Sequence, residues 1–297
     1  MIALFALLPV VLALAWIWRL ARLDEPSRGR WLLRAADICA LLALLVLVTR
    51  WDIVGLHTRT LILAATVVTA GWSFWRHRRR SARSAVPWRR SDLVATLTSV
   101  ALMVGLAGFA ATGMLPPRSA IPLACPLAGD GGFMVVQGGG NQLVNHHAGH
   151  PEQARAVDIV AVGPLGFRAA GLLPRDVSRY RIWGAPVLSP CAGDVVEAVD
   201  GLPDLEPPKR DPAAAAGNHV VLACGAVTVE LAHLERGSVA VAAGGSVAPG
   251  DRLGRVGNSG NTTEPHLHLH AADAATGRAV AVRFGGVDPV RGRRLDC

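Results

Sequence analysis

Four long apolar stretches separated by arginines constrain the first 115 residues of this chain. Three are uncharged and cover residues 2–18, 60–75 and 93–115. A fourth, residues 35–48, is weaker because it carries Asp37 and is short unless it extends toward Leu56, which gives the range 35–56. About 17–25 apolar residues in a helix cross the hydrocarbon core of a bilayer, and seven of the eight Trp lie near the ends of these stretches, as at membrane interfaces. The pattern predicts four transmembrane helices in residues 1–115 rather than core helices of a soluble protein.

Arginine placement predicts the orientation of these helices. Residues 19–30 and 76–90 hold eleven Arg, whereas residues 50–59 hold two. The positive-inside rule puts both Arg-rich loops in the cytoplasm. The N-terminus and everything beyond residue 115 then lie outside, and the first stretch, which lacks a positive start and a cleavage site, is retained. We expect a multi-pass protein of the inner or plasma membrane with an extracytoplasmic C-terminal domain.

The net charge of +8 does not indicate a nucleic-acid partner. Residues 1–115 carry fourteen Arg and five acids, a net of +9, and the remainder carries sixteen Lys and Arg against seventeen acids, a net of −1. The near-neutral C-terminal region has no basic patch for phosphates. We therefore expect the lipid bilayer as a partner and no nucleic acid.

Beyond the helices, residues 116–130 are rich in Pro, Gly and Ala and are typical of a linker. Residues 131–297 alternate short apolar runs with Gly/Pro turns, which is typical of antiparallel β-structure. The strands expected cover residues 194–199, 219–224, 226–234, 238–241, 252–256 and 265–270. The pattern predicts an N-terminal four-helix transmembrane region followed by an all-β domain, an antiparallel sandwich or barrel rather than βαβ units.

Four of the five cysteines lie in the region expected outside the membrane, where disulfides form. If residues 194–199 and 218–223 are antiparallel neighbours, paired residue numbers sum to about 417. The sum for Cys191 and Cys224 is 415, so they lie within bridging range. Cys125 and Cys297 then pair by elimination.

Histidines cluster in the segment Pro265-His266-Leu-His268-Leu-His270. In a strand, His266 and His268 project to the same face, with Cα atoms about 6.5–7 Å apart. One imidazole can then bind a metal while the other reaches a water or a substrate oxygen.

Further metal-binding candidates lie upstream. Asp158 sits inside an apolar run, where a buried unpaired carboxylate is unfavourable unless a cation neutralises it. His146, His147 and His150 precede it. His233 shares its strand parity with three apolar residues, which predicts an inward-facing position, either as a core histidine or in a site.

The segment Asn258-Ser-Gly-Asn-Thr-x-x-Pro-His-Leu-His, together with Ala-His233-Leu and the His…Asp158 element, resembles the lysostaphin/LytM-type zinc metallopeptidases. These are peptidoglycan endopeptidases with a duplicated hybrid motif fold, so the resemblance implies that the all-β domain is an antiparallel β-sandwich with an active-site groove. The resemblance covers residues from about 133 to the C-terminus. It implies that His147, Asp158 and His268 bind Zn²⁺. It also implies that His233 and His266 act on the attacking water and the oxyanion.

Two departures from the family pattern matter. His147 and Asp158 are eleven residues apart where four is common, which leaves His146 and His150 open as the first ligand; the Asn145-x-His spacing favours His147. His270 stands where an acidic residue is common and is expected at the rim of the site or behind a ligand. We expect substrate contacts from Asn258, Asn261 and His270.

The function predicted is a membrane-anchored zinc metalloendopeptidase that cuts peptide cross-bridges of peptidoglycan. One alternative is a catalytically silent relative that binds peptidoglycan or regulates another hydrolase. Another is a phosphocarrier, because the fold is shared with sugar-transport domains that carry a phosphorylated His. The outward topology argues against the phosphocarrier.

Reporter fusions test the topology. A reporter after residue 297 should be active only outside the membrane, and one near Arg83 only inside, because eleven Arg hold the two inner loops in the cytoplasm. The reverse pattern would contradict both the orientation and a substrate in the cell wall.

Overall fold

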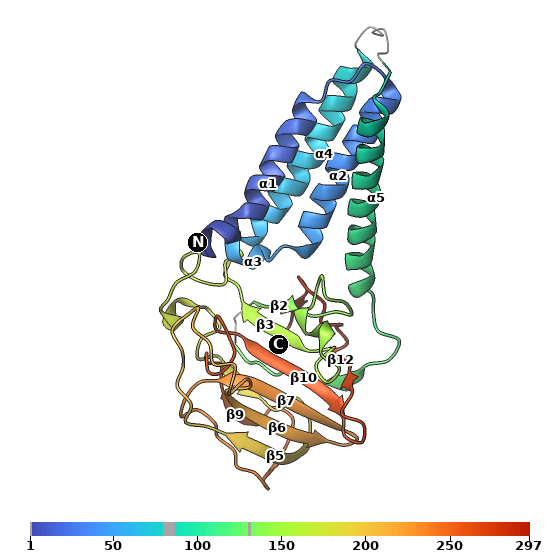
Figure 1. Cartoon of the computed structure of the whole chain (residues 1–297). Coiled ribbons are helices and arrows are strands. Elements are labelled where there is room, and N and C mark those ends of the chain that lie inside the picture. The colour runs from blue at the N-terminus through green and yellow to red at the C-terminus, as the bar shows by residue number, and fades with distance from the viewer. Residues whose placement is uncertain (1, 80–86, 130–131) are drawn as a thin grey trace. The chain divides into compact units, whose positions relative to one another are not determined.

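The computed structural model describes residues 2–79, 87–129 and 132–297. The chain divides into two units, Met1–Ala111 and Thr112–Cys297 (Figure 1). The predicted domain boundary at residues 130 and 131 lies outside the described residues, as do Arg80 and Arg83 of the second Arg-rich loop.

Helices make up the first unit. They are α1 (Ile2–Arg22), α2 (Arg28–Val48), α3 (Trp51–Val54), α4 (Leu56–Arg78) and α5 (Arg90–Gly113), which continues into the second unit. Helix α2 begins after Ser27, whose side chain caps the helix by accepting from Arg30 N. Its buried residues recur every three or four positions, so one face packs against α1 and α4. The Trp31 indole N–H donates to Ser73 of α4 at 3.2 Å.

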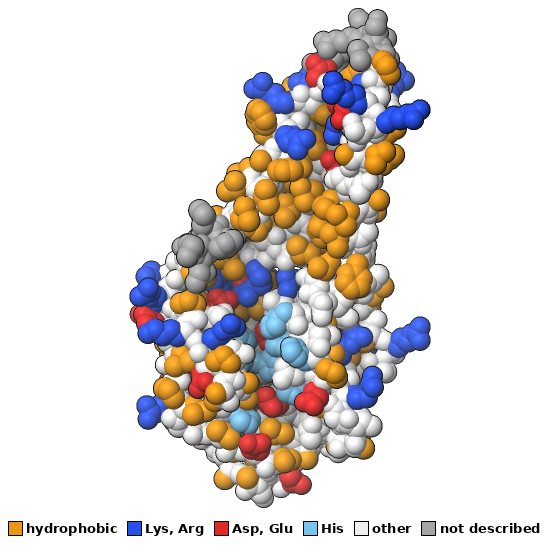
Figure 2. All heavy atoms as spheres, viewed as in Figure 1, with side chains coloured by type: hydrophobic (Ala, Val, Ile, Leu, Met, Phe, Trp, Pro, Cys, Tyr) orange, Lys and Arg blue, Asp and Glu red, His pale blue; other side chains and the backbone are white. Residues whose placement is uncertain are grey.

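Two helices among the described residues, α2 and α5, are long and apolar enough to cross a membrane by length and composition, where four were predicted. Helix α4 does not meet this criterion, although residues 60–75 were predicted to cross the membrane. Arg59 and Arg76 bound an uncharged stretch that also contains several Thr and Ser, so its hydropathy is lower. Helix α1 begins with residues whose side chains lie outside the description. The surface of the helical unit carries many hydrophobic side chains, among them Val67, Val68 and Val94, each more than half exposed (Figure 2).

The second unit is mainly β-structure, as predicted. One nine-stranded sheet, with every neighbouring pair antiparallel, runs in the order β13-β2-β3-β10-β7-β6-β5-β8, and β11 pairs with β10. Its strands are β2 (Phe133–Gln137), β3 (Val157–Ala161), β5 (Gly193–Val199), β6 (Asn218–Cys224), β7 (Val227–Leu234), β8 (Ser246–Val247), β10 (Leu267–Asp273), β11 (Ala279–Val280) and β13 (Arg294–Leu295). Two small sheets join β1 (Ile121–Leu123) to β12 (Val282–Phe284) and β4 (Pro186–Leu188) to β9 (Arg252–Arg255).

The core lies on one face of the large sheet. Residues of the small sheets, such as Val187, Leu253 and Phe284, share one buried cluster with Leu231 and Leu269 of the large sheet. The arrangement is therefore one large sheet covered on one face by small ones, rather than a sandwich of two similar sheets. The opposite face of β10 and β7 is left for polar side chains, which is where the histidines lie.

Two predicted segments differ from the structure. Residues 238–241 do not form a strand, because the Asp200 carboxylate accepts from the backbone N–H groups of Gly237 and Val239 and holds this stretch as a loop. The predicted linker contains β1, whose parallel pairing with β12 ties this stretch to the domain.

Both predicted disulfides are present. In the β5–β6 pair, Asp194 faces Ala223 and Val195 faces Leu222, the predicted register. Cys191 and Cys224 have Cα atoms 6.0 Å apart, and Cys125 and Cys297 have Cα atoms 5.4 Å apart. Cys39 is free. The Cys125–Cys297 bridge joins two residues near the ends of the β-domain.

Non-reducing peptide mapping tests this pairing. We expect the two linked peptides Cys125–Cys297 and Cys191–Cys224, because both Cα separations fall in the range of about 4.4–6.8 Å that a disulfide spans. The Cys39→Ser variant, as a control, should give the same map. Four free thiols, or a Cys125–Cys191 peptide, would contradict the fold around these ends.

Candidate metal centre

Strand register brings the first two candidate ligands together. His268 of β10 lies directly opposite Asp158 of the neighbouring β3, so both side chains project from the same face of the sheet. The His268 Nδ1 is 2.9 Å from Asp158 Oδ1. Asp158 is only 3% exposed, which means that its charge has to be neutralised by neighbouring groups rather than by water.

His147 approaches the same carboxylate from the loop before β3. Its Nε2 lies 3.1 Å from each Asp158 oxygen. The buried Asn145 places this loop: its Oδ1 accepts from the His147 backbone N–H, and its Nδ2 donates to Gly139 O and Ala156 O. Of the three histidines that the sequence left open, His147 is therefore the one held on Asp158.

His146 and His150 take other positions. His146 is exposed, and its ring lies against that of His147 at a tilt of 37°, with centroids 3.8 Å apart. Its donor atom lies within 4.8 Å of those of His147 and Asp158, so proximity alone does not distinguish it. His147 is distinguished from His146 by its contact with both oxygens of the Asp158 carboxylate.

The three groups fit a zinc ion in donor chemistry. Zinc takes imidazole nitrogens and carboxylate oxygens, and at bond lengths of about 2.1 Å a tetrahedral ion holds its donors about 3.4 Å apart. The distances of 2.9 and 3.1 Å around Asp158 are close to that spacing. Burial lowers the pKa of His268, which keeps the ring neutral as a ligand must be. Burial on its own would raise the pKa of Asp158, but His266, His147 and His268 together hold it well below its usual range.

His233 reaches the site through a β-bulge. In the β6–β7 pair, Asn218 lies opposite Leu234 and Val220 lies opposite Leu231. One residue separates these two positions on β6 and two residues separate them on β7, so β7 contains an extra residue. His233 has φ 65°, a left-handed conformation that is unfavourable for a non-glycine residue. The prediction that His233 continues the apolar row is therefore wrong: the bulge turns it out of the core and returns Leu234 to it.

Hydrogen bonds hold His233 in this conformation. Its backbone N–H donates to Ala216 O and its carbonyl accepts from Gly257 N–H, both at 3.0 Å. Its Nδ1–H donates to Ser259 O at 2.9 Å, which leaves Nε2 unprotonated in the neutral ring. Burial, followed by the nearby His266 and His268, lowers the pKa of His233 well below its usual value. Its ring centroid lies 4.9 Å from that of His266.

His266 precedes β10 and is oriented by the same means. Its Nδ1–H donates to Glu264 O at 2.9 Å, and its Nε2 lies 3.6 Å from Asp158 Oδ1. The Glu264 side chain is in turn bound by the fully buried Arg168, whose Nε donates to it at 2.7 Å. Arg168 thus anchors the turn that orients His266.

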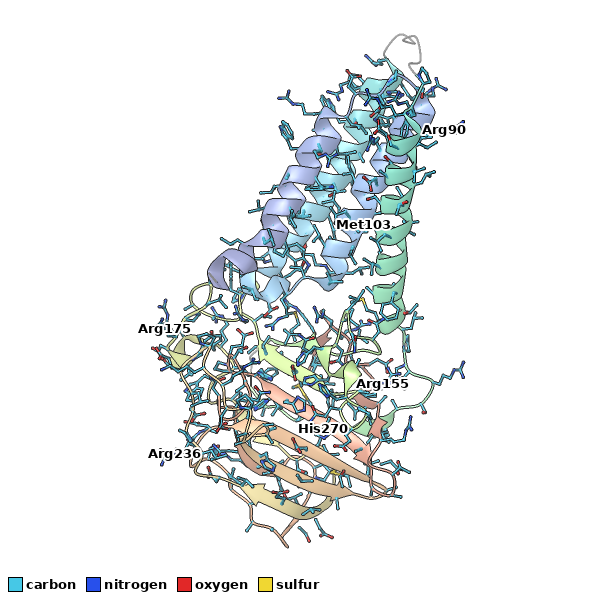
Figure 3. All side chains as sticks on the ribbon, in the orientation of Figure 1. Arg90, Met103, Arg155, Arg175, Arg236 and His270 are labelled. Carbon is cyan, nitrogen blue, oxygen red and sulfur yellow. A yellow bond between two sulfur atoms is a disulfide. The ribbon has the colours of Figure 1, made fainter. Side chains whose placement is uncertain are left out.

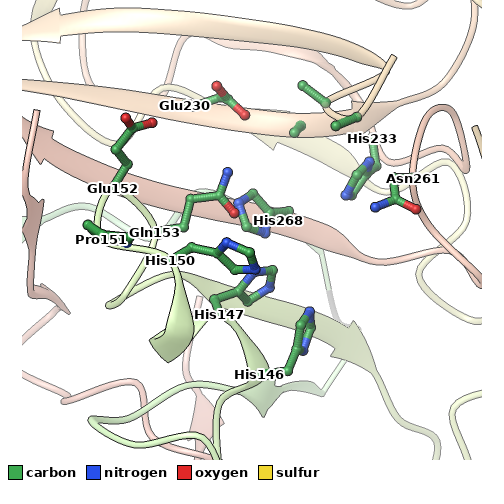
Figure 4. A pocket seen from close by; sticks show the side chains of 13 residues that line it. His146, His147, His150, Pro151, Glu152, Gln153, Glu230, His233, Asn261 and His268 are labelled. Atoms are coloured by element: carbon green, nitrogen blue, oxygen red, sulfur yellow. The ribbon is translucent and has the colours of Figure 1, made fainter. Parts of the chain in front are cut away.

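A cleft of about 580 Å³ is lined by three of these groups, His147, His233 and His268, whereas Asp158 and His266 are not among its lining residues. Figure 4 shows His147 and His268 at its floor, with Asn261 and His233 on one side and Glu152 and Glu230 on the other. Figure 2 shows the histidines at the surface of this unit. His270 is not among the residues that line the cleft. Asn261 lines it and remains a candidate substrate contact.

Asn258 corrects the prediction of a substrate contact, since it is fully buried. Its Nδ2 donates to Leu205 O and its backbone N–H to Asp204. The following Ser259 bridges Asn218 and Leu234 through its hydroxyl. Gly260, at φ 85°, packs so closely on Gly217 that a Cβ would not fit. This part of the motif therefore shapes the loop instead of contacting a ligand.

Comparison with known proteins shows one family. Residues 180–281 match the model of Peptidase family M23, a stretch that includes His233, His266 and His268 but not His147 or Asp158. No curated protein matches the chain.

Solved structures that resemble the chain include two peptidases. The catalytic domain of the antimicrobial peptidase lysostaphin from Staphylococcus simulans is 27% identical, over 31% of this chain and 60% of that one, with a TM-score of 0.24. A zinc-containing peptidase from Vibrio cholerae is 20% identical, over 53% of this chain and 35% of that one, with a TM-score of 0.29. The chain spans less than two thirds of either protein.

Zinc analysis of three variants tests the choice of the first ligand. His147→Ala should lose zinc, because removal of one of three protein donors undoes such a site. His146→Ala and His150→Ala should keep about one zinc per chain, since their rings do not hold the carboxylate. Zinc loss in either control variant together with retention in His147→Ala would mean that the wrong histidine has been assigned.

Proposed function

We propose that the C-terminal unit, of which residues 180–281 match Peptidase family M23, is a zinc-dependent endopeptidase that hydrolyses peptide bonds of peptidoglycan. The observation that carries the proposal is the convergence of four histidines on or beside the buried Asp158, next to the cleft. His147, Asp158 and His268 offer a two-nitrogen, one-oxygen donor set. His233 and His266 stand beside it with their Nδ1 atoms committed to carbonyls.

Three donors leave a zinc ion an open position, which is characteristic of a catalytic rather than a structural site. Zinc, when bound there, would polarise the scissile carbonyl and lower the pKa of a water molecule toward about 7. Glu152 and Glu230 also line the cleft, but the groups beside the donor set are imidazoles, so we assign the acid–base work to His233 and His266.

His233 is the proposed base. Because its pKa is held well below the usual value, it stays neutral near pH 7 and its Nε2 has a free lone pair. The bond from Nδ1–H to Ser259 O keeps the ring in this tautomer. It can therefore accept a proton from the attacking water and later return it to the leaving amine.

His266 is the proposed donor to the oxyanion. The Glu264 carbonyl fixes its Nδ1–H, so in the protonated ring Nε2–H faces the carboxylate side of the site, where Asp158 lies. A positioned donor at the developing negative charge stabilises the transition state more than the substrate. Asn261, on the same side of the cleft as His233, is placed to hold the peptide backbone.

We place this unit outside the membrane, anchored by the helical unit. The arginine asymmetry of the loops and the two apolar helices support this location. An extracytoplasmic position would bring the cleft to the cell wall, and disulfides suit the same compartment.

Metal content measured beside hydrolysis of purified peptidoglycan tests the proposal. His268→Ala should lose zinc and activity together. His266→Ala and His233→Ala should keep about one zinc per chain while turnover falls by about 10²–10⁴, the range for a positioned proton-transfer group. His219→Ala, a histidine of β6 outside the cleft, should match the parent in both measurements.

Two results would count against this assignment. Zinc loss in His266→Ala with retention in His268→Ala would mean that the two roles are reversed. A parent chain that holds zinc but releases no peptide from peptidoglycan would instead be a silent, wall-binding relative.

A further inference from the structure

His268 uses both of its ring nitrogens. Its Nδ1 faces Asp158 at 2.9 Å, and its Nε2 lies 3.2 Å from His270 Nδ1. A neutral imidazole carries one proton, so it can present a lone pair at only one nitrogen and must donate from the other. Which nitrogen is free therefore depends on what the other one contacts.

His270 supplies the contact on the far side of His268. It lies two residues further along β10 on the same face of the sheet, and Figure 3 labels it. If a metal takes the lone pair of His268 Nδ1, the Nε2–H of His268 points at His270 Nδ1, which then accepts it while His270 carries its own proton on Nε2. That proton needs an acceptor in turn.

Glu230 is placed to provide that acceptor. The register of β7 against β10 sets Glu230 directly opposite His270, with both side chains on the cleft face. The donor atoms of Glu230, His268 and His270 lie within 4.8 Å of one another. The Glu230 side chain is also part of the cleft wall.

We propose that His270 and Glu230, the outer pair, keep His268 in the tautomer protonated at Nε2, so that Nδ1 is free to bind the metal. The inference rests on the proposed zinc site, but concerns affinity for the metal rather than hydrolysis. A carboxylate and a histidine in series thus stand behind one ligand, and both are positioning residues. Partners of this kind orient a ligand and raise its basicity, and their loss weakens metal affinity by about 10–100-fold.

The same three residues could be read as a second metal site, but the chemistry disfavours it. His268 would have to offer lone pairs at both nitrogens, which requires a doubly deprotonated ring. The Nδ1 of His268 already faces Asp158, so His268 cannot also bind a metal through Nε2. Only Glu230 and His270 would then be left as ligands of a second metal.

Zinc affinity of the full chain in detergent, measured by competition with a chromophoric chelator, tests the proposal. His270→Ala should weaken binding about 10–100-fold. His270→Gln should recover most of it, since its amide oxygen can accept from His268. Glu230→Ala should weaken binding less than His270→Ala, because one step separates it from the ligand. All variants should bind one zinc per chain.

A matched control is available on the same sheet. His219 and Glu197 form a similar pair, with Nε2 and Oε1 3.5 Å apart, outside the cleft. His219→Ala and Glu197→Ala should leave the affinity unchanged, and the disulfide map of each variant should match the parent.

Three results overturn the proposal: parental affinity in His270→Ala, equal weakening in His270→Gln and His270→Ala, or two zinc ions per chain in the parent. Hydrolysis plays no part in this readout. If the variants follow the predicted affinities but the parent leaves peptidoglycan uncut, the role of the outer pair is supported and the proposed peptidase activity is rejected.

Discussion

A buried carboxylate in the middle of the large sheet governs the site. Asp158 stands on β3 between Val157 and Ile159, which face the core, and is itself directed to the opposite face, where His268 faces it from β10. Since side chains alternate along a strand, a slip of one residue between β3 and β10 would turn one of these partners into the core. An unpaired carboxylate there is strongly unfavourable, so the polar cluster and the sheet register enforce one another.

The histidines around Asp158 are held by hydrogen bonds to rigid backbone. His147 depends on the capping Asn145, His233 on the Ser259 carbonyl, and His266 on the Glu264 carbonyl. The left-handed backbone at His233 is unfavourable by about 1–3 kcal/mol in general. The hydrogen bonds of His233 with Ala216, Gly257 and Ser259 offset this cost. A site of this kind is largely arranged before any ligand arrives, so little reorganisation accompanies binding.

Much of this could be predicted from the sequence, because period-two alternation is a local property. It placed His266 and His268 on one face, and it gave the β5–β6 register from which the Cys191–Cys224 bridge follows. The same rule failed at His233, since a bulge shifts parity and depends on the neighbouring strand. Arg168 carried no signal at all: it meets Glu264 from 96 residues away. The role of Asn258 was misassigned because a polar residue in a motif can serve the loop instead of the ligand.

The central claim is that two imidazoles and one carboxylate bind the metal. Zinc K-edge X-ray absorption on the purified full chain tests it most directly, since it reports the donor atoms around the ion. We predict nitrogen and oxygen donors at about 2.0–2.1 Å with the outer scattering of two imidazole rings. A sulfur shell at about 2.3 Å, or the scattering of three or four imidazoles, would contradict the site described.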